Sequence, residues 1–343
     1  MLFAHPQDGL ALDPLLILFA ALLLDALVGD MKPLFKHVPH PVELVGRAIA
    51  WFDRRLNREN RSEATRRARG IFTVTLLIVT AALSGYLLER LCRATRFGWL
   101  AELVIIAVLV AQRSLFDRVY SVAIALSEKG LYAGREEIRH IVGRDPMSLD
   151  EHGVARAGIE SLAENFSDGV VAPVFWTLMF GLPGLLVYKT ANTLDSMIGH
   201  LSPRHRSFGW AAARLDDGLN LIPARVSGCM IALAAAIAPQ AQGRASILIM
   251  LRDAGKHRSP NAGWPEAAIA GALGLALAGP RRYAERVVDD PWIGEGRARA
   301  TPIDMHRALL IYVIACALQG LMLLALWLLL RSGLMPIGSR TTA

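Results

Sequence analysis

The sequence predicts an all-α, polytopic membrane protein that forms a single integral membrane domain over residues 1–343. Apolar residues make up 53% of the chain. Several apolar runs approach the roughly 20 residues needed to cross a bilayer, so we expect about five spans. The first of these runs is interrupted only by Asp13 and Asp25. The runs lie at residues 10–29, 71–88, 103–111 with their flanks, 231–238 with their flanks, and 308–330.

Two further apolar stretches, residues 170–187 and 267–278, are rich in Gly or Pro and have few Leu residues for their apolar character. They fit three structures: spans, re-entrant hairpins, or helices buried in protein. Irregular backbone at membrane depth is tolerated only inside protein or beside a water-filled cavity. The sequence leaves these three possibilities open for both stretches.

Charge near the N-terminus predicts topology. No Lys or Arg precedes the first apolar run, and Asp8 and Asp13 stand where a signal peptide is positive, so we expect no cleavable signal. The positive-inside rule places the following Arg-rich segment in the cytoplasm and the N-terminus outside, in a multi-pass protein of the inner membrane. Nucleic-acid binding is the other interpretation, but a position between two spans favours topology or anionic lipid. Seven arginines form the segment: Arg54, Arg55, Arg58, Arg61, Arg66, Arg67 and Arg69.

Several common motifs are missing. The cysteines, Cys92, Cys229 and Cys316, have no CxxC spacing and are expected to be small core residues. The chain has no P-loop, no GxGxxG, no HExxH helix and no GxSxG elbow. Any nucleotide site is therefore not of the Walker type.

Acidic residues recur on one predicted helix. Arg156, Glu160, Glu164 and Asp168 follow one another at intervals of four, which stacks them along one helical face. A solvated face with ion pairs would produce the same spacing. Asn165 and an apolar span lie next to these residues, and this context favours a functional site at the end of the helix.

A second polar group follows the next apolar stretch. Lys189 and Asn192 can share a helical face, with Asp195 adjacent. A lone Lys at the end of a span is usually a snorkelling anchor. Followed by the polar run that contains Asn192 and Asp195, Lys189 is better interpreted as a partner for phosphate or carboxylate.

A third polar group contains Asp216 and Asp217, followed by Asn220 and Arg225. Adjacent carboxylates point to different faces of a helix, so we expect one of the two to face the site. Carboxylate oxygens suit Mg²⁺ that bridges nucleotide phosphates, which takes one or two protein carboxylates.

Two histidines lie in segments rich in turn residues. His257 precedes Asn261 in KHRSPNAG, and His40 lies in HPHPV. Each histidine alone is more often a surface or capping residue. The neighbouring Arg258 and Asn261 make anion binding plausible for His257.

Together these segments resemble the CobD/CbiB family of cobalamin biosynthesis, the adenosylcobinamide-phosphate synthases. The similarity extends over residues 25–294 in family order, with the expected last span at 308–330 beyond it. One departure is Met31 after Gly29-Asp30, where the family commonly has Pro. The matching blocks are HPV from His40, RAGIESLAENFSDG from Arg156, YKTANTLDSMIG from Tyr188, DDGLNLIPAR from Asp216, and SPNAGWPEAAIAGA from Ser259.

The resemblance implies a ligase that uses ATP and Mg²⁺. It would join adenosylcobyric acid to (R)-1-amino-2-propanol phosphate, or a related amino alcohol, with membrane lipid and other cobalamin-pathway enzymes as partners and no nucleic acid. Because ATP is cytoplasmic, we expect the site to face the cytoplasm. We expect catalysis by Glu160, Glu164, Lys189 and His257; substrate or nucleotide binding by His40, Asn165, Asn192, Asp217, Asn220, Arg225 and Asn261; and metal binding by Asp168, Asp195 and Asp216.

The main alternative is a membrane transporter of an anionic substrate. Apolar segments broken by Gly or Pro and carrying charges are typical of transporters. Against this, the chain lacks two similar halves, and most charged motifs sit at segment ends. A non-catalytic assembly subunit is the weakest of the three interpretations.

Overall fold

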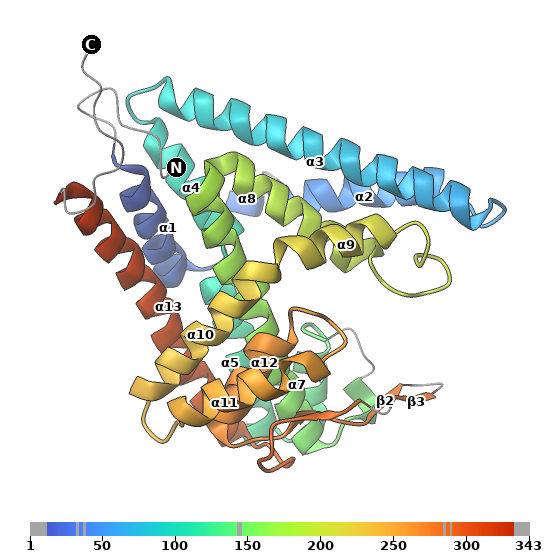
Figure 1. Ribbon diagram of the computed structural model, residues 1–343, viewed down its shortest axis with the longest axis vertical. Helices are drawn as coiled ribbons and strands as arrows, with labels where there is room; N and C mark the ends of the chain where they lie inside the picture. Colours follow the sequence, from blue (N-terminus) through green and yellow to red (C-terminus); the bar gives the residue numbers. More distant parts are fainter. Residues whose placement is uncertain are drawn as a thin grey trace.

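The computed structural model describes residues 12–31, 34–36, 39–142, 146–283, 286–288 and 290–332. The described residues are mostly helical, as predicted, with two short antiparallel strand pairs, β1–β4 and β2–β3 (Figure 1). The helices are α1 (Pro14–Val28), α2 (Pro41–Leu56), α3 (Glu63–Arg93), α4 (Gly98–Leu109), α5 (Gln112–Glu128), α6 (Leu131–Ile138), α7 (Glu151–Phe166), α8 (Ala172–Ile198), α9 (Trp210–Leu219), α10 (Leu221–Ile237), α11 (Gly243–Asp253), α12 (Gly263–Leu273) and α13 (Pro302–Arg331). The shorter elements are the 3₁₀ helices η1 (Leu34–Lys36), η2 (Pro146–Ser148) and η4 (Ala254–Lys256), the π-helix η3 (Ser167–Val171), and the strands β1 (Leu277–Ala278), β2 (Arg281–Tyr283), β3 (Arg286–Val288) and β4 (Trp292–Ile293).

The number of candidate membrane spans agrees with the prediction of about five, although the segments differ. Among the described residues, four helical segments are long and apolar enough to cross a bilayer, and the bent pair α9–α10 would make a fifth. The first predicted span forms α1, which has 15 residues and is shorter than these. The four segments are Glu63–Arg93, Gly98–Glu128, Glu151–Ile198 and Pro302–Arg331.

The two stretches that the sequence left open have different structures. Residues 170–187 lie within the longest candidate span, Glu151–Ile198. Residues 267–278 instead run from α12 into β1, and α12 is buried at almost every position. Its Ala and Gly residues allow close packing on α10 and α11. The second stretch is therefore a short helix buried in protein.

A break inside α8 is accommodated by α3. Gly181 has a φ of 67°, and Pro183 follows it within the helix. The freed backbone N–H of Leu182 donates a hydrogen bond to Oε2 of Glu89 on α3, at 3.1 Å. At Gly85 the two helices approach so closely that a Cβ atom would lie 2.6 Å from Cα of Pro183. Close packing and a satisfied backbone group thus join α3 to α8.

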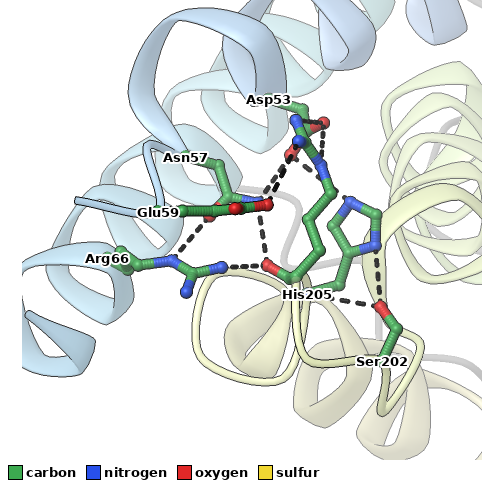
Figure 2. Close-up of polar contacts among 7 residues, drawn as sticks. Asp53, Asn57, Glu59, Arg66, Ser202 and His205 are labelled. Carbon is green, nitrogen blue, oxygen red and sulfur yellow. Dashed lines mark hydrogen bonds and ion pairs between the residues drawn. The ribbon is translucent and has the colours of Figure 1, made fainter. Parts of the chain in front are cut away.

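Figure 2 shows a polar network that joins α2 and α3, with the segment between them, to the α8–α9 loop. Oδ2 of Asp53 accepts a hydrogen bond from Nη2 of Arg204 at 2.8 Å, and its Oδ1 lies 3.4 Å from Nε2 of His205. Asn57 donates to the carbonyl of Arg204 at 3.0 Å. Nε of Arg66 donates to Oδ1 of Asn57 at 2.9 Å, and Nη2 of Arg66 donates to the Arg204 carbonyl.

The network favours the ionised form of Asp53. Burial opposes ionisation, but hydrogen bonds from Asn57 and Arg204 outweigh it, so the pKa of Asp53 lies below its ordinary value. A lowered carboxyl pKa stabilises the fold above the ordinary aspartate pKa, and this stabilisation is lost as pH falls through the lower folded-state value. The network therefore fixes the α8–α9 loop at neutral pH.

Part of the Arg-rich segment has a structural role that the sequence did not predict. Arg66 is only 8% exposed. Arg67 stacks on the Trp210 ring at 3.8 Å, and Arg69 donates to the carbonyl of Leu56. The other four arginines, Arg54, Arg55, Arg58 and Arg61, are exposed and remain available for the predicted contact with lipid.

We predict that Gly85→Val destabilises the protein, because the new side chain would collide with the backbone of α8. Overpacking of this kind costs about 1–3 kcal/mol. The melting temperature of detergent-purified protein should fall. Gly218→Val is the matched control, since a Cβ there meets no atom within 4 Å. Equal melting temperatures for the two variants would contradict the proposed close contact.

We also predict that Arg66→Gln lowers the melting temperature, because it removes donors from buried acceptors. Such a loss costs about 1–3 kcal/mol. Arg61→Gln makes the same chemical change at an exposed position of the same segment, and it should leave the melting temperature unchanged. If both variants melt alike, the network in Figure 2 does not stabilise the fold.

Candidate active site

Carboxylates from α7, the π-helix η3, α8 and α9 lie near enough to interact electrostatically. Asp168 in η3 interacts electrostatically with Glu164, Asp195 and Asp216. Asp195 also interacts with Asp217. We call these five residues the acidic cluster. The structure thus brings together the predicted metal-binding residues and two other predicted site residues from separate segments of the sequence.

The π-helix lies against a second interruption in the bundle. The carbonyl of Gly169 accepts a hydrogen bond from the N–H of Ala111, at 3.0 Å, in the break between α4 and α5. On the other side of this break, Oδ2 of Asp25 accepts from the N–H of Gln112 at 2.8 Å. π-Bulges are frequent at functional sites, and this one carries Asp168. The π-helix and the break between α4 and α5 thus pair a free N–H with a free carbonyl beside the acidic cluster.

A buried tyrosine and two amides hold the cluster in place. The hydroxyl of Tyr188 lies 3.1 Å from the carbonyl of Asp168 and 2.9 Å from Oδ1 of Asn220, and it can donate its proton to either. Nδ2 of Asn220 donates to Oδ2 of Asp216 at 3.0 Å, and Nδ2 of Asn192 donates to Oδ1 at 3.4 Å. The carboxylate of Asp216 is therefore oriented from both sides.

Lys189 borders the acidic cluster, and His40 lies near Lys189. Lys189 interacts electrostatically with Asp168. Lys189 and His40 line the same cavity of about 490 Å³. Nδ1 of His40 accepts from the N–H of Val42 at 3.2 Å, which caps α2. Burial, and after it the charge of Lys189, lowers the pKa of His40, which suits a neutral imidazole that accepts this bond.

The loop before α12 lies on α9. Nδ2 of Asn261 donates to the carbonyl of Asp217 at 2.8 Å. Oδ1 of Asn261 is buried and has no hydrogen-bond partner among the described residues. On the same loop, Nε2 of His257 lies 3.7 Å from Oε1 of Glu266. The loop therefore brings Asn261 to the acidic cluster, while the His257 ring faces Glu266.

Three predicted site residues have other contacts. Oε1 of Glu160 accepts a hydrogen bond from the N–H of Ala278 in β1, at 2.8 Å. A step of four residues turns about 40° around a helix, so Glu160 and Asp168 differ in direction. Asn165 lines a small cavity next to Gly169. Arg225 packs over the Trp264 ring at 4.5 Å.

The acidic cluster fits Mg²⁺ only if the nucleotide supplies part of the coordination shell. In the described part of the chain, no three His, Cys, Asp or Glu side chains are close enough to hold a metal by themselves. Mg²⁺ in such sites is bound by one or two carboxylates, with phosphate oxygens and water completing the shell. Asp168 and Asp216, which interact electrostatically, suit that smaller set.

Three hollows that share lining residues lie near the cluster, and their residues were missed from the sequence; we call the three hollows together the cleft. Three neighbouring hollows of about 490, 160 and 790 Å³ all include Ser114 and Arg118 of α5. His140 lines two of them, and Asp30 lines two. A weak signal was present, because Ser114 and Arg118 are four residues apart and share a helical face.

Comparisons with known proteins show which family the chain belongs to. The sequence profile of the CobD/Cbib protein family matches residues 18–312. Three curated relatives, each named cobalamin biosynthesis protein CobD, come from Sinorhizobium sp, Brucella melitensis and Rhodobacter capsulatus. They are 51%, 48% and 44% identical to the chain, respectively. The aligned regions include 91%, 90% and 88% of this chain, and 98%, 98% and 93% of the relatives' own lengths. No solved structure matches the chain significantly. With the profile covering most of its length, the chain belongs to the CobD/Cbib family.

Proposed function

We propose that this protein is an ATP-dependent amide ligase of cobalamin biosynthesis at the inner membrane. It would join a propionate side chain of adenosylcobyric acid to the amine of (R)-1-amino-2-propanol phosphate, or of a related amino alcohol phosphate. The observation that carries the proposal is the acidic cluster beside Lys189. Family membership supports the pathway, because the curated relatives are named for cobalamin biosynthesis.

The reaction needs activation of the carboxylate, because a carboxylate and an ammonium group do not condense in neutral water. A carboxylate oxygen attacks the γ-phosphorus of ATP, the bond to the β-phosphate oxygen breaks, and ADP leaves. The amine, after losing a proton, attacks the carbonyl carbon of the acyl phosphate. The carbon–oxygen bond to phosphate then breaks, which releases inorganic phosphate and leaves the amide.

The acidic cluster suits the first step. Asp168 and Asp216 would bind Mg²⁺, which neutralises phosphate charge as the γ-phosphoryl group is transferred. Asn192 and Asn220 orient Asp216. Lys189, next to Asp168, would bind a phosphate oxygen.

The second step needs a group that accepts a proton from the amine. Glu164 is exposed and belongs to the acidic cluster, so it is the best-placed base. We assign Glu160 to holding β1 instead, because its carboxylate binds the backbone of Ala278. His257 would help to position the loop that brings Asn261 to the acidic cluster.

The direct test is an assay with purified protein, Mg²⁺–ATP, adenosylcobyric acid and the amino alcohol phosphate. ADP and the amide product should appear only when both substrates are present. ATP consumption without amide formation, or no consumption at all, would contradict the proposal. Uptake of an anion by vesicles containing the protein, without ligation, would favour the transporter.

We predict that Asp168→Asn and Asp195→Asn each lower turnover by about 10²–10³-fold, the usual effect of losing one electrostatic contact to the transition state. Aspartate and asparagine have nearly the same size, so both variants should keep the wild-type melting temperature. Steady-state ADP release at saturating Mg²⁺ measures the loss.

Glu43→Gln is the control for these variants, because Glu43 pairs with Arg47 on the exposed face of α2. It should retain wild-type turnover. If the aspartate variants also turn over normally at the wild-type melting temperature, the acidic cluster does not bind the nucleotide.

We also predict that the loop before α12 faces the cytoplasm, where ATP is found. Gly255 is exposed, and a side chain there meets no atom within 4 Å. In an active variant without other cysteines, Gly255→Cys should react with a membrane-permeant maleimide in intact cells and resist an impermeant one. Reaction with the impermeant reagent would place the loop on the outer side and overturn the proposed orientation.

A further inference from the structure

The three hollows of the cleft meet at two side chains of α5. Arg118 of α5 lines all three, and Ser114 does so one helical turn earlier. One hollow contains Lys189, which interacts with Asp168. The smallest hollow reaches Gly169, next to Asp168 in the π-helix. A ligand bound at Arg118 would therefore lie in a cleft that leads to the acidic cluster.

Arg118 differs from its neighbour Arg113. Arg113 is paired with Asp117 at 2.8 Å. In the described part of the chain, no hydrogen bond or ion pair engages the guanidinium of Arg118. Arginine binds phosphate through parallel N–H donors, so an unpaired guanidinium inside a cleft suits a phosphate group.

The same cleft offers a group of opposite charge. Asp30 lines two of the hollows that Arg118 lines. A ligand that carries both a phosphate and an ammonium group would match this pair, with the phosphate at Arg118 and the ammonium directed toward Asp30. A cavity of about 490 Å³ also leaves room beside a small ligand for the arm of a larger second substrate.

We propose that this part of the cleft binds the amino alcohol phosphate, with Arg118 holding its phosphate and Asp30 its ammonium group. The inference rests on the proposed ligase function and adds the residues that select the phosphorylated substrate. Arg118 is then the residue that distinguishes the amino alcohol phosphate from the unphosphorylated amino alcohol.

The test compares kcat/KM for 1-amino-2-propanol phosphate and for 1-amino-2-propanol in the wild type and in Arg118→Ala. The wild type should prefer the phosphorylated substrate, and Arg118→Ala should reduce this preference by about 10- to 100-fold, as expected for loss of a charge-assisted contact. The KM for ATP should not change. Arg113→Ala, which removes a neighbouring but paired arginine, should keep the wild-type preference. Asp30→Asn should raise the KM of the amine substrate and leave that of ATP unchanged.

Calorimetric titration of each protein with the amino alcohol phosphate separates the two proposals. If the wild type binds the amino alcohol phosphate but forms no amide, the ligase proposal fails. The proposed binding site is then judged from the binding affinities of the variants alone. Weaker binding to Arg118→Ala than to Arg113→Ala supports the site. Equal binding to both variants, absence of binding to the wild type, or an unchanged substrate preference in an active Arg118→Ala overturns it.

Discussion

A hydrogen bond between two interrupted helices lies at the centre of this molecule. The N–H of Ala111, in the break between α4 and α5, donates to the carbonyl of Gly169 in the π-helix. In apolar surroundings an unpaired backbone group costs several kcal/mol. The break is also capped by Asp25 from α1, and the carbonyl of Gln112 accepts a hydrogen bond from Tyr312 of α13. The π-helix, α1 and α13 are therefore held in position around the break between α4 and α5.

The same irregularity explains why charge can persist among apolar helices. Where regular helix stops, carbonyl and N–H groups line the interior, and polar side chains find partners there. Asp168 lies in the π-helix, and the buried hydroxyl of Tyr188 joins its carbonyl to Asn220. Structural polar groups and candidate catalytic groups are thus joined by the same hydrogen bonds, so each limits the movement of the other.

Much of this arrangement could be predicted from the sequence, because it depends on local patterns. Apolar run length predicted the helical membrane fold, and the polar groups around Asp168, Asp195 and Asp216 do converge. Other features depend on contacts between distant segments. A helical face cannot reveal that Glu160 binds the backbone of Ala278, nor that Arg66 is buried by the α8–α9 loop. Tertiary packing decides where the side chains of Glu160 and Arg66 point.

The cleft brings opposite charges close together. Arg118 lies where its three hollows meet, and the smallest of these hollows reaches Gly169, next to Asp168 of the acidic cluster. Between apolar helices, electrostatic interactions are stronger than in bulk water. Under the proposed function, the acidic cluster would attract a metal-bound nucleotide, and Arg118 would attract a phosphate that carries no metal. Charge would then direct two phosphate-bearing substrates to different groups of one cleft, and Lys189, which lines one hollow and interacts with Asp168, would bind a phosphate oxygen beside the acidic cluster.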